Sequence, residues 1–174
     1  LDIQYPFASL DNRLEKDILN FFLETDPSAK IAKAEIEVTR GNWDAAVKLY
    51  LSAVNDGSAV ANFRLGLLCF NEMPSALKAE DCIDYLLKSA EMGYVNASLA
   101  VAAAFEEGIG VEKDEQLAQD ILAGVAPLLE TGELWFKYSE LYKQKFLVHN
   151  TQKQRQLLDR SVNEGYSKAE FLQV

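Results

Sequence analysis

Two cysteines and a single histidine are the residues of this chain whose types most readily support redox or metal chemistry. Cys69 and Cys82 lie on two successive helical patterns, at positions where other segments carry packing residues, so we expect their side chains to lie near each other. A pair of buried free thiols and, in an oxidising compartment, a disulfide both agree with this placement. His149 has no second histidine and no third thiol with which to complete a zinc site. The sequence therefore predicts no metal and no cofactor.

Motifs of common enzymes are missing from the sequence. It contains no Gly-x-Ser-x-Gly and no His-Glu-x-x-His, and we identify no nucleophile with a matching base. Gly108-Ile109-Gly110 follows a helical pattern rather than a strand and lacks the Lys-Ser/Thr of a phosphate loop, so we interpret it as a turn. His149 falls in a connection between helices, where a solvated side chain is expected. We predict that the protein is not an enzyme.

The charge balance limits the kinds of partner. The 174 residues include 17 Lys and Arg against 27 Asp and Glu, which gives a net charge of −10. Nucleic acids and anionic membranes favour the opposite sign, so the sequence disfavours both and leaves a basic protein or peptide partner.

Acidic residues gather near the tip of one predicted hairpin, where we expect a solvated helix end or, alternatively, a surface for a basic patch. They are Glu106, Glu107, Glu112, Asp114 and Glu115.

A repeated unit organises the chain. Small residues followed by glycine recur at Gly57, Gly93 and Gly165, with a looser case at Gly132, and the spacings of 36, 39 and 33 residues fall in the range of helical solenoids. Each terminal glycine is suited to end a helix with a positive φ. The recurring positions within the first helix of each unit predict one buried helical face. They are Ala61, Leu65, Gly66 and Cys69, then Ala97, Val101, Ala102 and Phe105, then Leu134, Tyr138, Ser139 and Tyr142.

The third of these positions is always small, which predicts that a neighbouring helix approaches closely there. A leucine at Gly66 should therefore overpack the contact and lower stability. The second helices carry their own stripe, and strand patterns are nearly absent, so we predict an all-α fold. The matched positions of the second helices are Cys82, Tyr85, Leu86, Ser89 and Ala90, then Ala118, Ile121, Leu122, Val125 and Ala126.

The repeats divide the chain into three parts. Residues 1–26 form an N-terminal segment with a capping helix at residues 11–24, and residues 27–165 form the repeats, at about 27–57, 58–93, 94–132 and 133–165. Residues 166–174 are a C-terminal cap or the start of a further helix. Asp26-Pro27 marks the start of the first repeat helix. Pro127 should stop or kink the second helix of the third unit.

The third unit carries a specific pattern, Ala97-(x3)-Val101-Ala102-(x2)-Phe105-(x2)-Gly108-Ile109-Gly110-Val111-(x2)-Asp114-(x3)-Ala118. This pattern strongly resembles the Sel-one-like repeat, a relative of the tetratricopeptide repeat. The first unit, with Gly41-Asn42-Trp43-Asp44 before its second helix, is more similar to a plain tetratricopeptide unit, and the fourth resembles the family weakly. The resemblance implies a right-handed α–α superhelix of about four hairpins. It also implies a non-enzymatic scaffold of the kind found in bacterial signalling, envelope and secretion systems.

The concave face, built by the first helices, is the expected binding surface for a partner protein or peptide. Ordinary packing between repeats would give the same apolar row. If the row binds a partner, polar substitution of Phe63 or Phe136 should weaken binding while the chain stays folded. A regulator that blocks a partner enzyme is the alternative function, and a hydrolase is disfavoured. The candidate binding residues are Phe63, Leu67, Phe70, Leu99, Phe136 and Glu140.

The compartment is predicted from two features. The chain begins at Leu1 rather than Met, which indicates a processed or trimmed start, and its two cysteines are placed to pair. No stretch approaches the roughly 18 apolar residues that a spanning helix needs. The start at Leu1 and the paired cysteine positions favour a periplasmic or exported protein over a cytoplasmic one.

Overall fold

The structure is a computed structural model that describes residues 20–21, 25–72, 77, 81–143 and 149–170. Its regular elements are all helical, and no strand occurs within these ranges. The helices are α2 (Pro27–Thr39), α3 (Trp43–Asn55), α4 (Ala59–Glu72), α5 (Cys82–Glu91), α6 (Val95–Glu107), α7 (Glu115–Val125), the 3₁₀ helix η2 (Ala126–Leu128), α8 (Glu133–Glu140), α9 (Thr151–Asn163) and α10 (Ser167–Glu170). The predicted all-α fold is confirmed.

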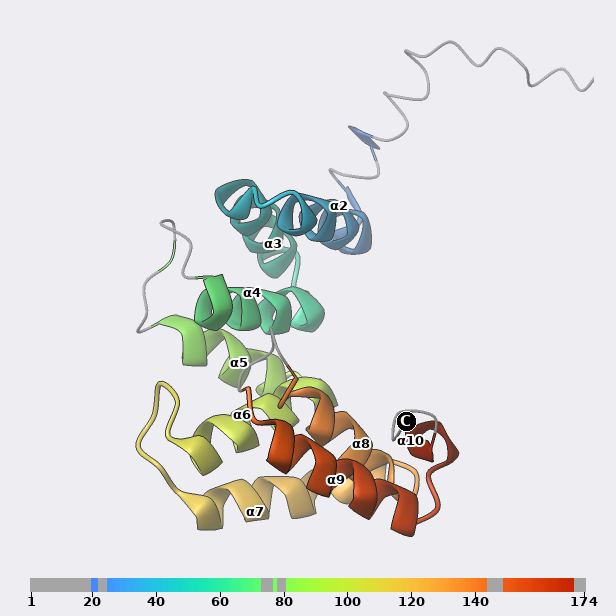
Figure 1. Cartoon of the computed structure of the whole chain (residues 1–174). Coiled ribbons are helices and arrows are strands. Elements are labelled where there is room, and N and C mark those ends of the chain that lie inside the picture. The colour runs from blue at the N-terminus through green and yellow to red at the C-terminus, as the bar shows by residue number, and fades with distance from the viewer. Residues whose placement is uncertain (1–19, 22–24, 73–76, 78–80, 144–148, 171–174) are drawn as a thin grey trace, which may run out of the picture.

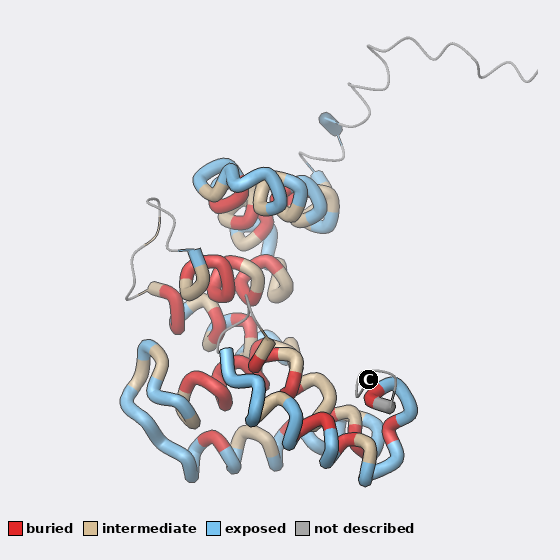
Figure 2. Tube along the Cα trace, viewed as in Figure 1, coloured by how far each residue is buried: buried red, intermediate tan, exposed pale blue. Residues whose placement is uncertain are grey.

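The helices pair into sequential hairpins, α2 with α3, α4 with α5, α6 with α7 and α8 with α9 (Figure 1). Neighbouring hairpins stack because α3 packs on α4 and α5 packs on α6. Buried residues concentrate on α4 and α6 in the middle of the stack, whereas most of α7 is exposed or half-buried (Figure 2). The predicted capping helix at residues 11–24 lies largely outside the described residues.

Glycines end the second helices as the repeat predicts. Gly93 has a φ of 82°, its backbone N–H donates to the Ala90 carbonyl at 2.9 Å, and the N–H of Tyr94 donates to the Ser89 carbonyl at 3.1 Å. These two bonds satisfy carbonyls that the end of α5 would leave unpaired and turn the chain toward α6. The same left-handed conformation and the same bonding pattern occur at Gly57 and Gly165.

The close approach predicted at Gly66 is present between α4 and α5. A Cβ atom at Gly66 would lie 2.7 Å from Cδ2 of Leu86 and 3.2 Å from the backbone oxygen of Cys82. Only a residue without a side chain leaves room for this contact. The matching residues Ala102 and Ser139 are fully buried, so the small position keeps its role in the later hairpins.

A disulfide links the two helices of the second hairpin. Cys69 of α4 and Cys82 of α5 are both buried, their Cα atoms are 5.3 Å apart, and their sulfur atoms are bonded. Of the two alternatives left by the sequence, the structure has the disulfide rather than two free thiols. The described residues contain no other cysteine.

The junction between the third and fourth hairpins differs from the earlier ones. α7 ends at Val125, and Pro127 sits in the short 3₁₀ helix that follows, as the sequence predicts. Whereas α4 and α6 pack on the second helix of the preceding hairpin, α8 lies chiefly against the first helix, α6. The end of α7 before Pro127 therefore coincides with a change in how the fourth hairpin packs on the third.

Glu106 of α6 accepts hydrogen bonds from three side chains of the fourth hairpin. The hydroxyls of Tyr138 and Tyr142 each donate to its Oε2 at 2.7 Å, and Nζ of Lys153 on α9 donates to Oε1 at 2.7 Å. Burial would raise the pKa of Glu106, but these hydrogen bonds outweigh it and lower the pKa. The sequence prediction grouped Glu106 with a solvated acidic tip, and this is wrong because the fourth hairpin folds back over it. Glu107, Glu112, Asp114 and Glu115 are exposed, as expected.

Candidate binding site

The first helices of three hairpins enclose a pocket of about 240 Å³, here called the central pocket. Aromatic and aliphatic side chains form much of its lining, and polar side chains from all three helices complete it. Such a combination suits one apolar group held in a defined orientation. The lining residues are Phe63 and Arg64 of α4; Tyr94, which precedes α6; Asn96 and Leu99 of α6; Phe136, Lys137 and Glu140 of α8; and Leu141, which follows α8.

Four of the six predicted binding residues meet in the central pocket, namely Phe63, Leu99, Phe136 and Glu140. Leu67 instead lines a second pocket, which lies between the first hairpin and α4. The ring of Phe70 lies against the loop between α6 and α7, where a Cβ at Gly110 would be only 3.0 Å from it. Four of the six residues thus surround one pocket, whereas Leu67 faces the first hairpin and Phe70 faces the loop after α6.

Two aromatic pairs border the central pocket. The rings of Phe63 and Tyr94 meet edge to face with centroids 5.2 Å apart, and Phe136 meets Tyr166 at the same separation. Phe63 is only 4% exposed, so it belongs to the core as much as to the pocket, while Phe136 is half-buried. The amide of Asn96 donates to the Tyr94 hydroxyl at 3.2 Å, which positions a polar group beside the aromatic wall.

The charged residues of the central pocket are balanced by neighbours outside it. Arg64, Lys137 and Glu140 each have one ion-pair partner that does not line the pocket, so no lining charge is left unneutralised. The partners are Glu35 at 3.0 Å from Arg64, Glu133 at 3.4 Å from Lys137, and Lys143 beside Glu140. An apolar group, rather than an ion, fits such a pocket best.

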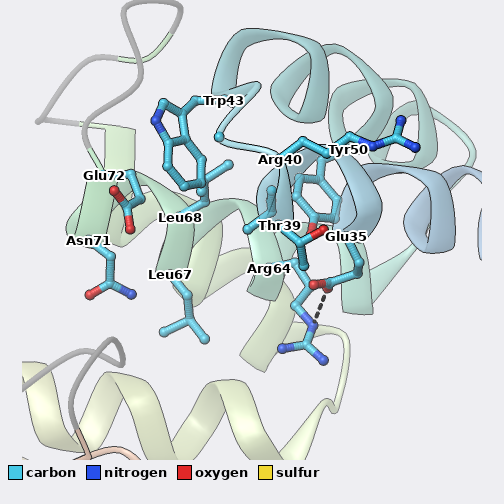
Figure 3. A pocket seen from close by; sticks show the side chains of 12 residues that line it. Glu35, Thr39, Arg40, Trp43, Tyr50, Arg64, Leu67, Leu68, Asn71 and Glu72 are labelled. Atoms are coloured by element: carbon cyan, nitrogen blue, oxygen red, sulfur yellow. Dashed lines mark ion pairs between the residues drawn. The ribbon is translucent and has the colours of Figure 1, made fainter.

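A larger pocket of about 580 Å³ lies between the first hairpin and α4, and we call it the Trp43 pocket (Figure 3). Arg64 lines both pockets, so the two adjoin along α4. The sequence patterns did not indicate this pocket, although Trp43, the first residue of α3, was a usable signal. The lining residues are Glu35, Val38, Thr39, Arg40, Gly41, Trp43, Tyr50, Arg64, Leu67, Leu68, Asn71 and Glu72.

A half-buried ion pair and a buried tyrosine line part of the Trp43 pocket. Oε1 of Glu35 and Nε of Arg64 are 3.0 Å apart, an electrostatic contact whose angle does not suit a hydrogen bond (Figure 3). Burial raises the pKa of Tyr50, and the Glu35 carboxylate beside it raises that pKa further. Tyr50 therefore stays neutral across the physiological range and offers no general base.

No family model matches the chain, and no curated protein matches its sequence. A solved Sel1 repeat protein from Oxalobacter formigenes superposes on 93% of this chain with a TM-score of 0.58 and 18% sequence identity. The fold of this chain is that of a Sel1 repeat protein. This likeness agrees with the resemblance carried by the third unit.

The Sel1 repeat fold of this chain corresponds to only part of that relative. The chain spans about half of the Oxalobacter formigenes protein, 48% of its length. A second solved structure, a putative Sel1 repeat protein from Klebsiella pneumoniae subsp. pneumoniae, has 16% identity and a TM-score of 0.40 over 83% of this chain and 89% of its own. None of the helices in the described part of the chain combines the length and the apolar character needed to cross a membrane.

Proposed function

We propose that this protein is a non-enzymatic scaffold that binds a segment of a partner polypeptide along its concave face, built by α2, α4, α6 and α8. The observation that carries the proposal is the central pocket, where four residues of the predicted row meet around an apolar lining with balanced charges. An apolar side chain of the partner would fill this pocket as an anchor, and the polar lining would orient the segment.

The fold and the charge support the same proposal. Arrays of helical hairpins present an extended surface to a partner, and Sel1-like repeats generally mediate protein interactions. The net charge of −10 favours a partner with basic residues, because opposite charges steer association. The central pocket offers no unpaired charged group to a reacting substrate, so binding, rather than catalysis, is the function it suits.

A displayed library of random 12-residue peptides tests the proposal. Peptides selected on the wild-type protein should lose about tenfold or more in affinity for Asn96→Trp, because the indole would fill the mouth of the central pocket. Gln119→Trp is the matched control, since Gln119 is exposed on α7 and lines neither pocket. Failure to select any peptide, or equal affinity for both variants, would reject the concave-face site.

Polar substitution of Phe63 is unsuitable for this test. With 4% of its surface exposed and its ring packed on Tyr94, Phe63 contributes to folding, so a loss of binding would not report on the pocket alone. Asn96 is half-buried at the start of α6, and its replacement disturbs a single hydrogen bond.

We propose an oxidising compartment, such as the bacterial periplasm, as the location of the protein. A bonded pair of buried cysteines is compatible with such a location and unusual in a reducing one. A thiol assay on protein isolated without reductant and then unfolded should find no reactive thiol. Two reactive thiols would argue for a reducing compartment.

A further inference from the structure

We propose that the Trp43 pocket receives a lysine or arginine side chain of the same polypeptide segment whose apolar side chain fills the central pocket. This inference rests on the proposed function and names the chemistry of the partner. The occupant carries a basic residue close to an apolar residue, because Arg64 lines both pockets and the two sites are contiguous along α4.

The charges of the Trp43 pocket favour a cation. Of its four charged lining residues, Glu35 and Arg64 neutralise each other at 3.0 Å. Arg40 is neutralised by Glu37 at 3.0 Å, which lies outside the lining. Glu72 has no ion-pair partner among the described residues, so its carboxylate leaves one negative charge on the pocket wall. The central pocket, by contrast, is fully balanced.

The uncharged part of the lining fits the rest of a basic side chain. Lysine and arginine combine an apolar stem with a charged head, and stems of this kind pack along aliphatic surface. Leu67 and Leu68 of α4 supply that surface on one side, and the half-buried indole of Trp43 supplies an aromatic face on which a cation can rest (Figure 3). A volume of about 580 Å³ accommodates the whole side chain.

The net charge of the chain could also explain the binding of basic peptides, and the experiment must distinguish this from binding in the Trp43 pocket. A protein with a charge of −10 attracts basic peptides without any specific pocket. Glu91 provides the matched control, because Glu72 and Glu91 are each the exposed last residue of a helix, α4 and α5, and Glu91 lines neither pocket. At the C-terminal end of a helix a carboxylate is not stabilised by the helix dipole, so glutamine at either position leaves the fold intact.

The test is a double-mutant cycle on the best peptide from the displayed library. We expect selected peptides to share a lysine or arginine near an apolar residue. Changing that basic residue to glutamine should weaken binding by about tenfold, the sum of a cation–π contact and an exposed ion pair. Glu72→Gln in the protein removes only the ion pair and should weaken binding by about threefold. Making both changes together should cost no more than the peptide change alone, because Glu72 then has no cation with which to pair. Glu91→Gln should leave the affinity within about twofold.

Two results would overturn the inference. One is a set of selected peptides without a shared basic residue. The other is an equal loss for Glu72→Gln and Glu91→Gln, which would assign the attraction to net charge. If Asn96→Trp still abolishes binding in either case, the concave face remains the binding surface and only the basic-side-chain assignment falls. If no peptide is selected at all, the proposed function falls with it.

Discussion

The second and fourth hairpins hold their own two helices together by the same contact, although their sequences differ. In α4–α5 the hydroxyl of Ser89 donates to the Ala59 carbonyl at 2.7 Å. In α8–α9 the hydroxyl of Ser161 donates to the Gly132 carbonyl at the same distance. Both serines are fully buried, and each joins the last part of the second helix to the start of the first.

The same two hairpins also meet the next helix in the same way. Phe63 contacts Tyr94, the residue before α6, and Phe136 contacts Tyr166, the residue before α10, with ring centroids 5.2 Å apart in both cases. One turn later, Ala97 and Ala169 are each completely buried. α10 therefore takes the place after the fourth hairpin that α6 takes after the second.

The difference between the two hairpins lies at one position of the repeat, occupied by Cys69 in α4 and by Tyr142 just after α8. Cys69 bonds to Cys82 within its own hairpin, whereas Tyr142 donates to Glu106 of the preceding hairpin. The repeat fixes where this side chain lies, and the residue type decides whether it ties the hairpin to itself or to its neighbour. The packing pattern of the repeat therefore does not by itself determine which covalent or hydrogen bond this side chain forms.

The largest effect should come from the close helix contact of the second hairpin. Gly66→Leu must displace Leu86 or the α5 backbone, and we expect a loss of about 3 kcal/mol or more in the free energy of unfolding. Gly124→Ala is the control within a helix of the third hairpin, where an added Cβ meets no atom within 4 Å. It should raise the stability by about 0.5–1 kcal/mol. Denaturant melts measure both, and an unchanged Gly66→Leu would contradict the repeat alignment.

Reduction of the disulfide should come next. Closing a chain segment of 13 residues stabilises the folded state by about 3 kcal/mol in the chain-entropy account. A reductant should therefore lower the free energy of unfolding by that amount, which is measured as a lower unfolding midpoint. The double substitution of Cys69 and Cys82 by alanine serves as the control, because its midpoint should not respond to the reductant. Identical melts of the wild-type protein with and without reductant would show that the bond contributes no stability.

The tie of the fourth hairpin is tested by Glu106→Gln. We expect a loss of about 2 kcal/mol at pH 7, since hydrogen bonds to a charged acceptor contribute more than neutral ones. The pKa of Glu106 is lower in the folded protein than its unfolded value of about 4.3. The stabilisation is therefore complete above that pH and is lost as the pH falls through the folded-state pKa.

The pH dependence of stability distinguishes hydrogen bonds to the charged Glu106 carboxylate from packing that does not depend on charge. The stability gap between the wild-type protein and Glu106→Gln, measured by urea unfolding, should shrink below about pH 4. Glu107→Gln, next to it and exposed, should change the stability by less than about 0.5 kcal/mol at any pH. A gap that does not vary with pH would mean that the carboxylate charge is not what holds the fourth hairpin.

The smallest effect concerns the shared serines. Ser89→Ala and Ser161→Ala should each cost about 1 kcal/mol, because each removes one hydrogen bond to a backbone carbonyl. Equal losses in thermal melts would sharpen the equivalence of the two hairpins. If one substitution is silent and the other costs several kcal/mol, the two hairpins are not equivalent in energy.

The sequence by itself determined the helices, their ends and their packing faces. Gly93 and Gly165 predict helix ends because a positive φ is a property of a single residue, and Ala97, Leu65 and Tyr138 predict a buried face because the helical period is local. The gathering of Phe63, Leu99, Phe136 and Glu140 was foreseen for the same reason, since a repeat carries one face into register with the next.

Only the tertiary structure decided which side chains of different hairpins meet. Glu106 became a half-buried acceptor, and Glu35, Arg64 and Trp43 came to line one pocket, because the packing of one hairpin on another brings together residues distant in sequence. The pattern of a single helix contains the direction of each side chain but not the position of the neighbouring hairpin. At the junction after α7 that position changes, and there sequence reasoning failed for Glu106.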